Sequence, residues 1–322
     1  MARGRRFAVA IAATALALGS LAAAGCGDDD DSASDTAGGG GAALSGNIAI
    51  DGSSTVGPLT SAAAEAFNAE NSGVNITVGT SGTGGGFELF CNGETDISNA
   101  SAPINDEQIA ACEAGGVTYE ELRVASDGIT LVTSSSGDVG GDNLTLAQLK
   151  AIWAPGSKIN NWSDIPGGSF NDVPLTLAGA DSQSGTYDFF NETVLGEDAA
   201  GETIESRQDY TASADDNVTV RAVQSAEGGL GYFGFTYYEE NVDTLKAFNL
   251  NGVAPTVETI TDGTYPLSRP LFIYAKTTAL DRPEVKAFVQ YYLENATTLA
   301  EGQQFVPAPQ AALDEAIAKV GA

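Results

Sequence analysis

The segment Asn47–Leu59, with the sequence NIAIDGSSTVGPL, decides the fold. Its first four residues alternate as a short strand does, and the run Asp51–Thr55 is a turn made of Gly, Ser and Thr. Pro58 then marks the start of a helix that we predict to end near Ala69. A strand that passes through a hydroxyl-rich turn into a helix is the repeating unit of an α/β protein.

The same unit recurs along the chain. We expect further strands at 74–78, 96–98, 128–132, 174–178, 230–235 and 270–274. We expect a short helix around 87–90 and a further helix that Asn105 or Asp106 caps and that carries Ile109, Ala110 and Cys112. We also expect helices at 145–153, 185–195, 216–224, 283–294 and 311–320. The alternation predicts an α/β fold with largely parallel sheets, and the Ser/Gly-rich stretch at 134–141 indicates a crossing into a second lobe.

The first 25 residues have the anatomy of a signal peptide. Three arginines precede an uncharged apolar run, Phe7–Leu21, which is too short to serve as an ordinary membrane span. Cys26 follows Ala-Ala-Gly and resembles the lipidated Cys of a bacterial lipobox, although Ala23 occupies a position where lipoboxes usually carry Leu. We therefore expect a lipid anchor at Cys26, with plain secretion as the alternative, and a flexible acidic and Gly-rich tether over residues 26–45.

Two further cysteines remain for the folded body. Cys91 and Cys112 form an even pair in an exported protein, which favours a disulfide worth about 3 kcal/mol. The alternative is a pair of buried thiols.

The charge balance excludes several classes of protein. The chain has 43 acidic residues, 14 basic residues and no His, with a net charge of −29. This acidity argues against nucleic acid and anionic membrane surfaces as partners. The lack of His excludes Ser-His-Asp hydrolases, Cys-His proteases and His-ligated zinc. The remaining carboxylates show no spacing typical of a catalytic pair or a calcium loop, so we expect no catalytic residue, metal or cofactor.

Three loops share a composition that suits oxyanions. Asp51–Thr55, Gly79–Gly86 and Ala180–Thr186 each place Gly and hydroxyl residues between a strand and a helix. Free backbone N–H groups at a helix start, together with hydroxyl donors, bind oxyanions, and Gly permits a close approach. A capped turn is the alternative for any one loop alone. Because all three loops lack Lys, none is a P-loop.

Five segments together resemble PstS-type phosphate-binding proteins of bacterial ABC transporters. They are DGSSTVGPL at 51–59, GTSGTGGGF at 79–87, DISNASAPI at 96–104, SQSGT at 182–186 and GGLGYFG at 228–234. The resemblance implies the two-lobed periplasmic-binding-protein fold of type II, in which each lobe is a mixed, mostly parallel sheet flanked by helices. Lobe 1 would comprise 46–128 and 267–322, and lobe 2 would comprise 129–266, with hinges near 127–129 and 265–268.

The resemblance also implies a set of phosphate ligands. Carried over residue by residue, these are Ser54, Thr55, Ser81, Thr83, Gly84, Ser101, Asp181, Ser184, Gly185 and Thr186. Asp181 would accept a hydrogen bond from a protonated phosphate, which sulfate cannot offer. Family members carry Arg at the position of Ala102 or shortly before the Ser-Gly-Thr loop, and both are missing here. Arg207 is the first candidate to replace them, with Arg221 and Arg269 as second choices.

The sequence therefore predicts a monomeric, lipid-anchored, extracytoplasmic binding protein that delivers phosphate to a membrane permease. The same fold binding sulfate, molybdate or tungstate is one alternative. An anchored phosphatase or a hydrolase that uses Ser54 or Ser184 is another, and a phosphate sensor is a third.

Overall fold

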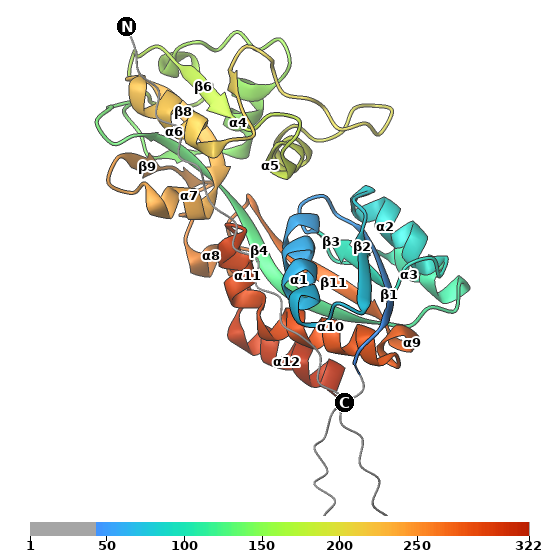
Figure 1. Ribbon diagram of the computed structural model, residues 1–322. Helices are drawn as coiled ribbons and strands as arrows, with labels where there is room; N and C mark the ends of the chain where they lie inside the picture. Colours follow the sequence, from blue (N-terminus) through green and yellow to red (C-terminus); the bar gives the residue numbers. More distant parts are fainter. Residues whose placement is uncertain (1–42, 322) are drawn as a thin grey trace, which may run out of the picture. The chain divides into compact units, whose positions relative to one another are not determined.

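The computed structural model describes residues 43–321. The predicted signal peptide, Cys26 and most of the tether lie outside the described residues. Ten of the described strands form a mixed sheet in the order β2-β1-β3-β11-β4-β8-β6-β7, and β9 and β12 also pair with β4. Figure 1 labels all of these strands except β7 and β12. The α/β class and the two-lobed fold are confirmed, since two separate hydrophobic cores lie along this path.

The first lobe is built on three parallel strands and one long antiparallel strand. β1 (Gly46–Gly52) lies between β2 (Val74–Val78) and β3 (Ile97–Ala100), and β11 (Ser268–Lys276) runs antiparallel to β3. Its core includes Phe67 and Phe288, whose rings meet edge to face. The helices of this lobe are α1 (Gly57–Glu70), α2 (Gly82–Cys91), α3 (Asp106–Ala114), α9 (Thr277–Leu280), α10 (Pro283–Glu294), α11 (Ala296–Gly302) and α12 (Gln310–Gly321), and the short strand β12 is Val306–Pro307.

The second lobe repeats the parallel arrangement in a smaller sheet. β6 (Thr176–Gly179) pairs in parallel with β8 (Gly229–Gly234) and with β7 (Thr211–Ala212). Trp153, Phe190 and Tyr232 are fully buried and their rings are in mutual contact at the centre of this core. The other elements are α4 (Leu146–Trp153), η1 (Trp162–Asp164), α5 (Gly185–Phe190), η2 (Asn191–Leu195), α6 (Asp216–Ser225), α7 (Phe235–Glu240), α8 (Val257–Thr261), β9 (Leu245–Ala247) and the separate pair β5 (Asn143–Leu144) and β10 (Asn249–Leu250).

One strand runs through both lobes. β4 (Tyr119–Ser134) pairs with β11 along its first part and with β8 and β9 along its second part. It is longer than the strand predicted at 128–132, because Glu120, Glu121 and Arg123 interrupt the apolar pattern, whereas pairing with β11 holds their backbone in the sheet. The lobe boundaries expected at 128/129 and 266/267 stay predictions.

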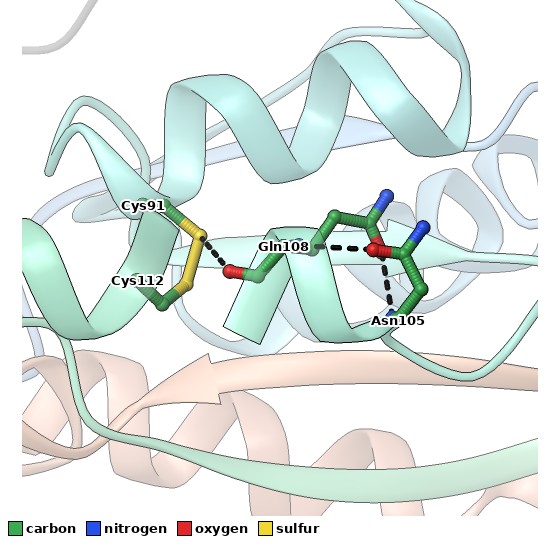
Figure 2. Close-up of a disulfide and its surroundings, with 4 residues drawn as sticks. All are labelled: Cys91, Asn105, Gln108 and Cys112. Atoms are coloured by element: carbon green, nitrogen blue, oxygen red, sulfur yellow. Dashed lines mark hydrogen bonds between the residues drawn. A yellow bond between two sulfur atoms is a disulfide. The ribbon is translucent and has the colours of Figure 1, made fainter. Parts of the chain in front are cut away.

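The disulfide is confirmed. Cys91, at the end of α2, is bonded to Cys112 in α3, with a sequence separation of 21 (Figure 2). Asn105 caps α3, because its side chain accepts from the backbone N–H of Gln108 while the Gln108 side chain accepts from that of Asn105. The bond therefore ties together two helices of the first lobe.

Within residues 43–321, no helix combines the length and the apolar character needed to cross a membrane.

Candidate functional site

A cavity of about 530 Å³ lies where loops of the two lobes meet. The strands that feed these loops run in parallel, so their carboxyl ends lie at one edge of each sheet, which is where open α/β sheets bind ligands. The lining residues are Ser53, Ser54, Thr55, Gly82, Thr83, Gly84, Ser101, Ala102, Asp188, Phe189, Glu192, Thr193 and Arg269.

The turn after β1 supplies a hydroxyl whose proton is free. Ser53 is buried, and its Oγ accepts from the backbone N–H groups of Thr55 and Val56, which fixes the turn at the start of α1. The Oγ1 of Thr55 accepts a 2.8 Å hydrogen bond from Nη2 of Arg269. Because the hydroxyl is an acceptor in that bond, its own proton remains available to a ligand in the cavity.

The loops after β2 and β3 supply a second pair of hydroxyls. The Oγ1 of Thr83 accepts from the backbone N–H of Ser101 at 3.2 Å, and the two side-chain oxygens lie 3.0 Å apart. One hydroxyl proton is used between them, and the other is free to point at a ligand. An added Cβ would meet no atom within 4 Å at Gly82 or Gly84, so both glycines face open space.

Arg269, at the start of β11, supplies the positive charge. Its side chain is nearly buried, and its Nε and Nη2 lie 3.2 Å from Oδ2 of Asp127. Nη2 also donates to the carbonyl of Gly185 in the second lobe, and the guanidinium lies 4.0 Å above the ring of Phe189. Nη1 donates to no other atom of residues 43–321, so its two N–H groups can serve an anion.

Two carboxylates face the same cavity from the second lobe. Burial raises the pKa of the Asp188 carboxyl, and Arg269 acts against this rise. Burial also raises the pKa of Glu192, where Arg269 opposes the rise and the neighbouring charge of Asp188 adds to it. A cavity for an anion therefore carries hydroxyl donors and a guanidinium on one side and two acidic groups on the other.

The comparisons with known proteins agree on one family. A family model described as a PBP superfamily domain matches residues 37–296. Protein SphX of Synechococcus elongatus is 45% identical over 270 residues, which are 81% of this chain and 77% of that protein. Phosphate-binding protein PstS of Staphylococcus saprophyticus is 39% identical over 289 residues, which are 85% of this chain and 86% of that protein.

A solved structure gives the same result. The crystal structure of a possible phosphate binding protein from Planctomyces limnophilus is 41% identical, with a TM-score of 0.80, over 86% of this chain and 98% of that one. The chain belongs to the PstS family. Its substrate-binding fold is therefore that of the family, and the predicted ligands of the PstS family can be placed one by one.

Five of the predicted PstS ligands come together in the cavity, namely Ser54, Thr55, Thr83, Gly84 and Ser101. Ser81 does not line it. Its hydroxyl and its backbone N–H both donate to Oδ1 of Asp51, at 2.6 and 2.9 Å. Ser81 therefore holds the start of α2 against the end of β1.

The second-lobe loop 180–186 lies outside the lining, and its Gly185 touches two of the lining residues, Arg269 and Thr55. The carbonyl of Gly185 accepts from Arg269, and a Cβ added to Gly185 would lie 2.7 Å from Oγ1 of Thr55. Ser184 caps α5 by accepting from the backbone N–H of Thr186. The Asp181 side chain accepts from the backbone N–H of Gln183, and Asp181, Ser184 and Thr186 are not among the lining residues.

Arg207 lines a different cavity, whereas Arg269, one of the two second choices, lines this one. The side chain of Arg207 is 4% exposed and pairs with Asp209 through two hydrogen bonds. Its other N–H groups donate to the carbonyls of Ile152 and Ile159 and to the side chain of Asn160. All the guanidinium nitrogens are thus engaged in holding α4 and neighbouring loops of the second lobe together.

Sequence reasoning missed Asp188 and Glu192, although their spacing of four residues in a predicted helix places them on one face. Across the described part of the chain, no group of three or more acidic or Cys side chains is arranged to hold a metal ion.

Proposed function

We propose that this chain is an extracytoplasmic solute-binding protein that holds inorganic phosphate in the cavity between its lobes and delivers it to an ABC-transporter permease. The observation that carries the proposal is the buried Arg269, whose Nη1 donates to none of residues 43–321 and whose Nη2 donates to Thr55, beside the hydroxyls of Ser54, Thr83 and Ser101. Guanidinium forks and hydroxyl donors are the groups that recognise tetrahedral oxyanions. The phosphate-binding names of the relatives support the same ligand.

The ligand set follows from the cavity. We infer that Ser54, Thr55, Thr83, Gly84, Ser101 and Arg269 hold the anion from the first lobe and that Ser184, Gly185 and Thr186 approach when the lobes close. The cavity is larger than one phosphate, which fits a conformation that still has to close. Closure would bend the chain where β4 and the start of β11 cross between the lobes.

The setting of the protein follows from its family and its leader. We infer a monomer that is anchored to the membrane through a lipidated Cys26 and that binds its ligand without chemical turnover. A permease would recognise the closed form, which the bound anion stabilises.

Calorimetric titration of the ligand-stripped protein tests the proposal. Phosphate is expected to bind with micromolar or tighter affinity, whereas sulfate and molybdate produce no heat. Binding of sulfate or molybdate alone would move the function to another oxyanion. No heat with any of the three would reject an oxyanion site, and steady hydrolysis of a phosphate ester would reject the assignment as a binding protein.

A further inference from the structure

Two hydroxyls of the ligand cavity come from segments that the disulfide joins. Thr83 lies in the first turn of α2, and Ser101 lies between β3 and α3. Their side-chain oxygens are 3.0 Å apart, and Oγ1 of Thr83 also accepts from the backbone N–H of Ser101. At its far end α2 stops at Cys91, which is bonded to Cys112 in α3 (Figure 2). The two segments are therefore joined by hydrogen bonds at the cavity and by a covalent bond away from it.

The two helices can carry the effect of this covalent bond to the cavity. α2 is one unbroken helix, so about 12 Å of regular backbone separates Thr83 from Cys91. Asn105 caps α3 and fixes the start of that helix just after Ser101. Because each helix moves as one piece, a change in their spacing at the disulfide alters the spacing of Thr83 and Ser101.

A hollow separates the two helices between these two connections. Its volume is about 330 Å³, and its lining includes Gly84, Phe87 and Glu88 from α2 and Gln108 and Ala111 from α3. Together with Cys91, the three α2 residues follow the i, i+3, i+4, i+7 spacing of one helix face. Gly84 lines both this hollow and the ligand cavity. Since empty space provides no packing contacts, the side chains around the hollow do not by themselves fix the distance between the helices.

The disulfide itself is shielded from solvent. Cys91 is 3% exposed and Cys112 is 1% exposed, and both belong to the same small core cluster as Phe90 and Tyr274. A reductant can reach such a bond only after the two helices separate, so the bond holds their spacing permanently in an oxidising compartment.

We propose that the Cys91–Cys112 disulfide is a positioning element of the ligand cavity, which sets the spacing of α2 and α3 and thereby holds the Thr83 and Ser101 hydroxyls where one oxyanion can use both. This inference rests on the proposed function. The alternative is a bond that only stabilises the fold by constraining the unfolded chain. A positioning bond differs because it is coupled to the ligand, and the coupling is reciprocal: if the bond strengthens phosphate binding, bound phosphate makes the bond harder to reduce by the same factor.

The first test removes the bond by substitution. Cys91→Ala combined with Cys112→Val keeps the total side-chain volume nearly constant. Val223→Ala, in a buried core cluster of the second lobe, is the control for a loss of stability unrelated to the cavity. Calorimetric titration is carried out at a temperature where thermal unfolding shows every protein to be folded. We expect about a tenfold loss of phosphate affinity for the double variant and less than about a twofold change for Val223→Ala.

The second test reduces the bond in the unaltered protein. Dithiothreitol passes two electrons and two protons to the sulfurs of Cys91 and Cys112 and closes to a cyclic disulfide, so the ratio of its two forms sets the potential. Alkylation and mass spectrometry measure the reduced fraction in phosphate that saturates both forms and in sodium chloride of the same ionic strength. A tenfold coupling corresponds to a midpoint about 30 mV more negative in phosphate.

The two tests should give the same factor. A folded double variant that binds phosphate as the parent does, together with a midpoint that phosphate does not move, would overturn the inference and leave the proposed function intact. An equal loss of affinity in Val223→Ala, or a protein that unfolds as soon as the bond is lost, would also overturn it, because the bond would then act through stability alone. A parent protein that binds no phosphate would instead overturn the proposed function, and this inference with it.

Discussion

The Nη2 atom of Arg269 donates a 2.8 Å hydrogen bond to Oγ1 of Thr55, a residue 214 positions earlier in the chain. The same nitrogen lies 3.3 Å from the carbonyl oxygen of Gly185 in the second lobe. One guanidinium therefore joins the turn after β1 to the loop before α5 at the wall of the cavity, and it orients the Thr55 hydroxyl so that its proton is free.

Replacing Arg269 with Lys should lower phosphate affinity by about 100-fold or more, because a single ammonium cannot reach Thr55, Gly185 and the anion together. Calorimetric titration measures the change. Arg221→Lys, on the exposed face of α6, is the matched control and should bind as the parent does. An Arg269→Lys protein that is folded and keeps the parent affinity would remove Arg269 from the ligand set.

Replacing Arg207 should lower the stability of the protein and leave its phosphate affinity nearly unchanged. Its buried guanidinium holds Asp209, two carbonyls and Asn160, so Arg207→Lys should lower the free energy of unfolding by about 2–4 kcal/mol. Urea denaturation measures this loss. At a temperature where the variant stays folded, its phosphate affinity should remain within about twofold of the parent. A large loss of affinity without a loss of stability would show that Arg207 acts on the ligand.

Gly185 should not tolerate a methyl group. A Cβ at this position would lie 2.7 Å from Oγ1 of Thr55, which is itself held by Arg269, so Gly185→Ala should separate the two loops. We expect about a tenfold loss of phosphate affinity. Gly302→Ala is the control, because its Cβ would meet nothing within 4 Å. Equal affinities of the two variants would contradict this contact.

Asp216 should make stability depend on pH. Burial, together with the charges of Asp215 and Asp127, raises the pKa of its carboxyl to about 7. The folded protein thus binds this proton more tightly than the unfolded chain, so the stabilising effect is complete below about pH 4 and is lost as the pH rises through about 7. Comparing urea midpoints of the parent and Asp216→Asn from about pH 5 to 8, we expect the parent to lose stability relative to the variant. Parallel pH profiles would show that Asp216 titrates normally.

Much of the fold was predictable because its signals are local. The strand at Val74–Val78 and the helix at Pro283–Glu294 have the bounds expected from hydrophobic pattern and Pro placement. The short strands β7 and β9 were not predicted, because a strand of two or three residues is set by pairing with a distant partner, which no local pattern records.

The candidate site was predictable to a similar extent. Ser54, Thr55, Thr83 and Ser101 stand in loops with a recognisable Gly and hydroxyl composition, and the structure brings them to one cavity. The choice between Arg207 and Arg269 depends on contacts more than 200 positions apart, such as that with Thr55, so composition could not decide it. Asp188 and Glu192 did have a signal in their spacing, but acidic pairs on a helix are usually solvated.

The most direct test of the cavity is a crystal structure of the protein with arsenate, a tetrahedral analogue of phosphate whose arsenic atom is located by its anomalous scattering. We predict one strong arsenic peak in the cavity. The oxygens of the arsenate at this peak should lie within hydrogen-bond distance of the Arg269 guanidinium and the Thr55 and Thr83 hydroxyls. A peak beside Arg207, or an empty cavity at saturating arsenate, would contradict the account.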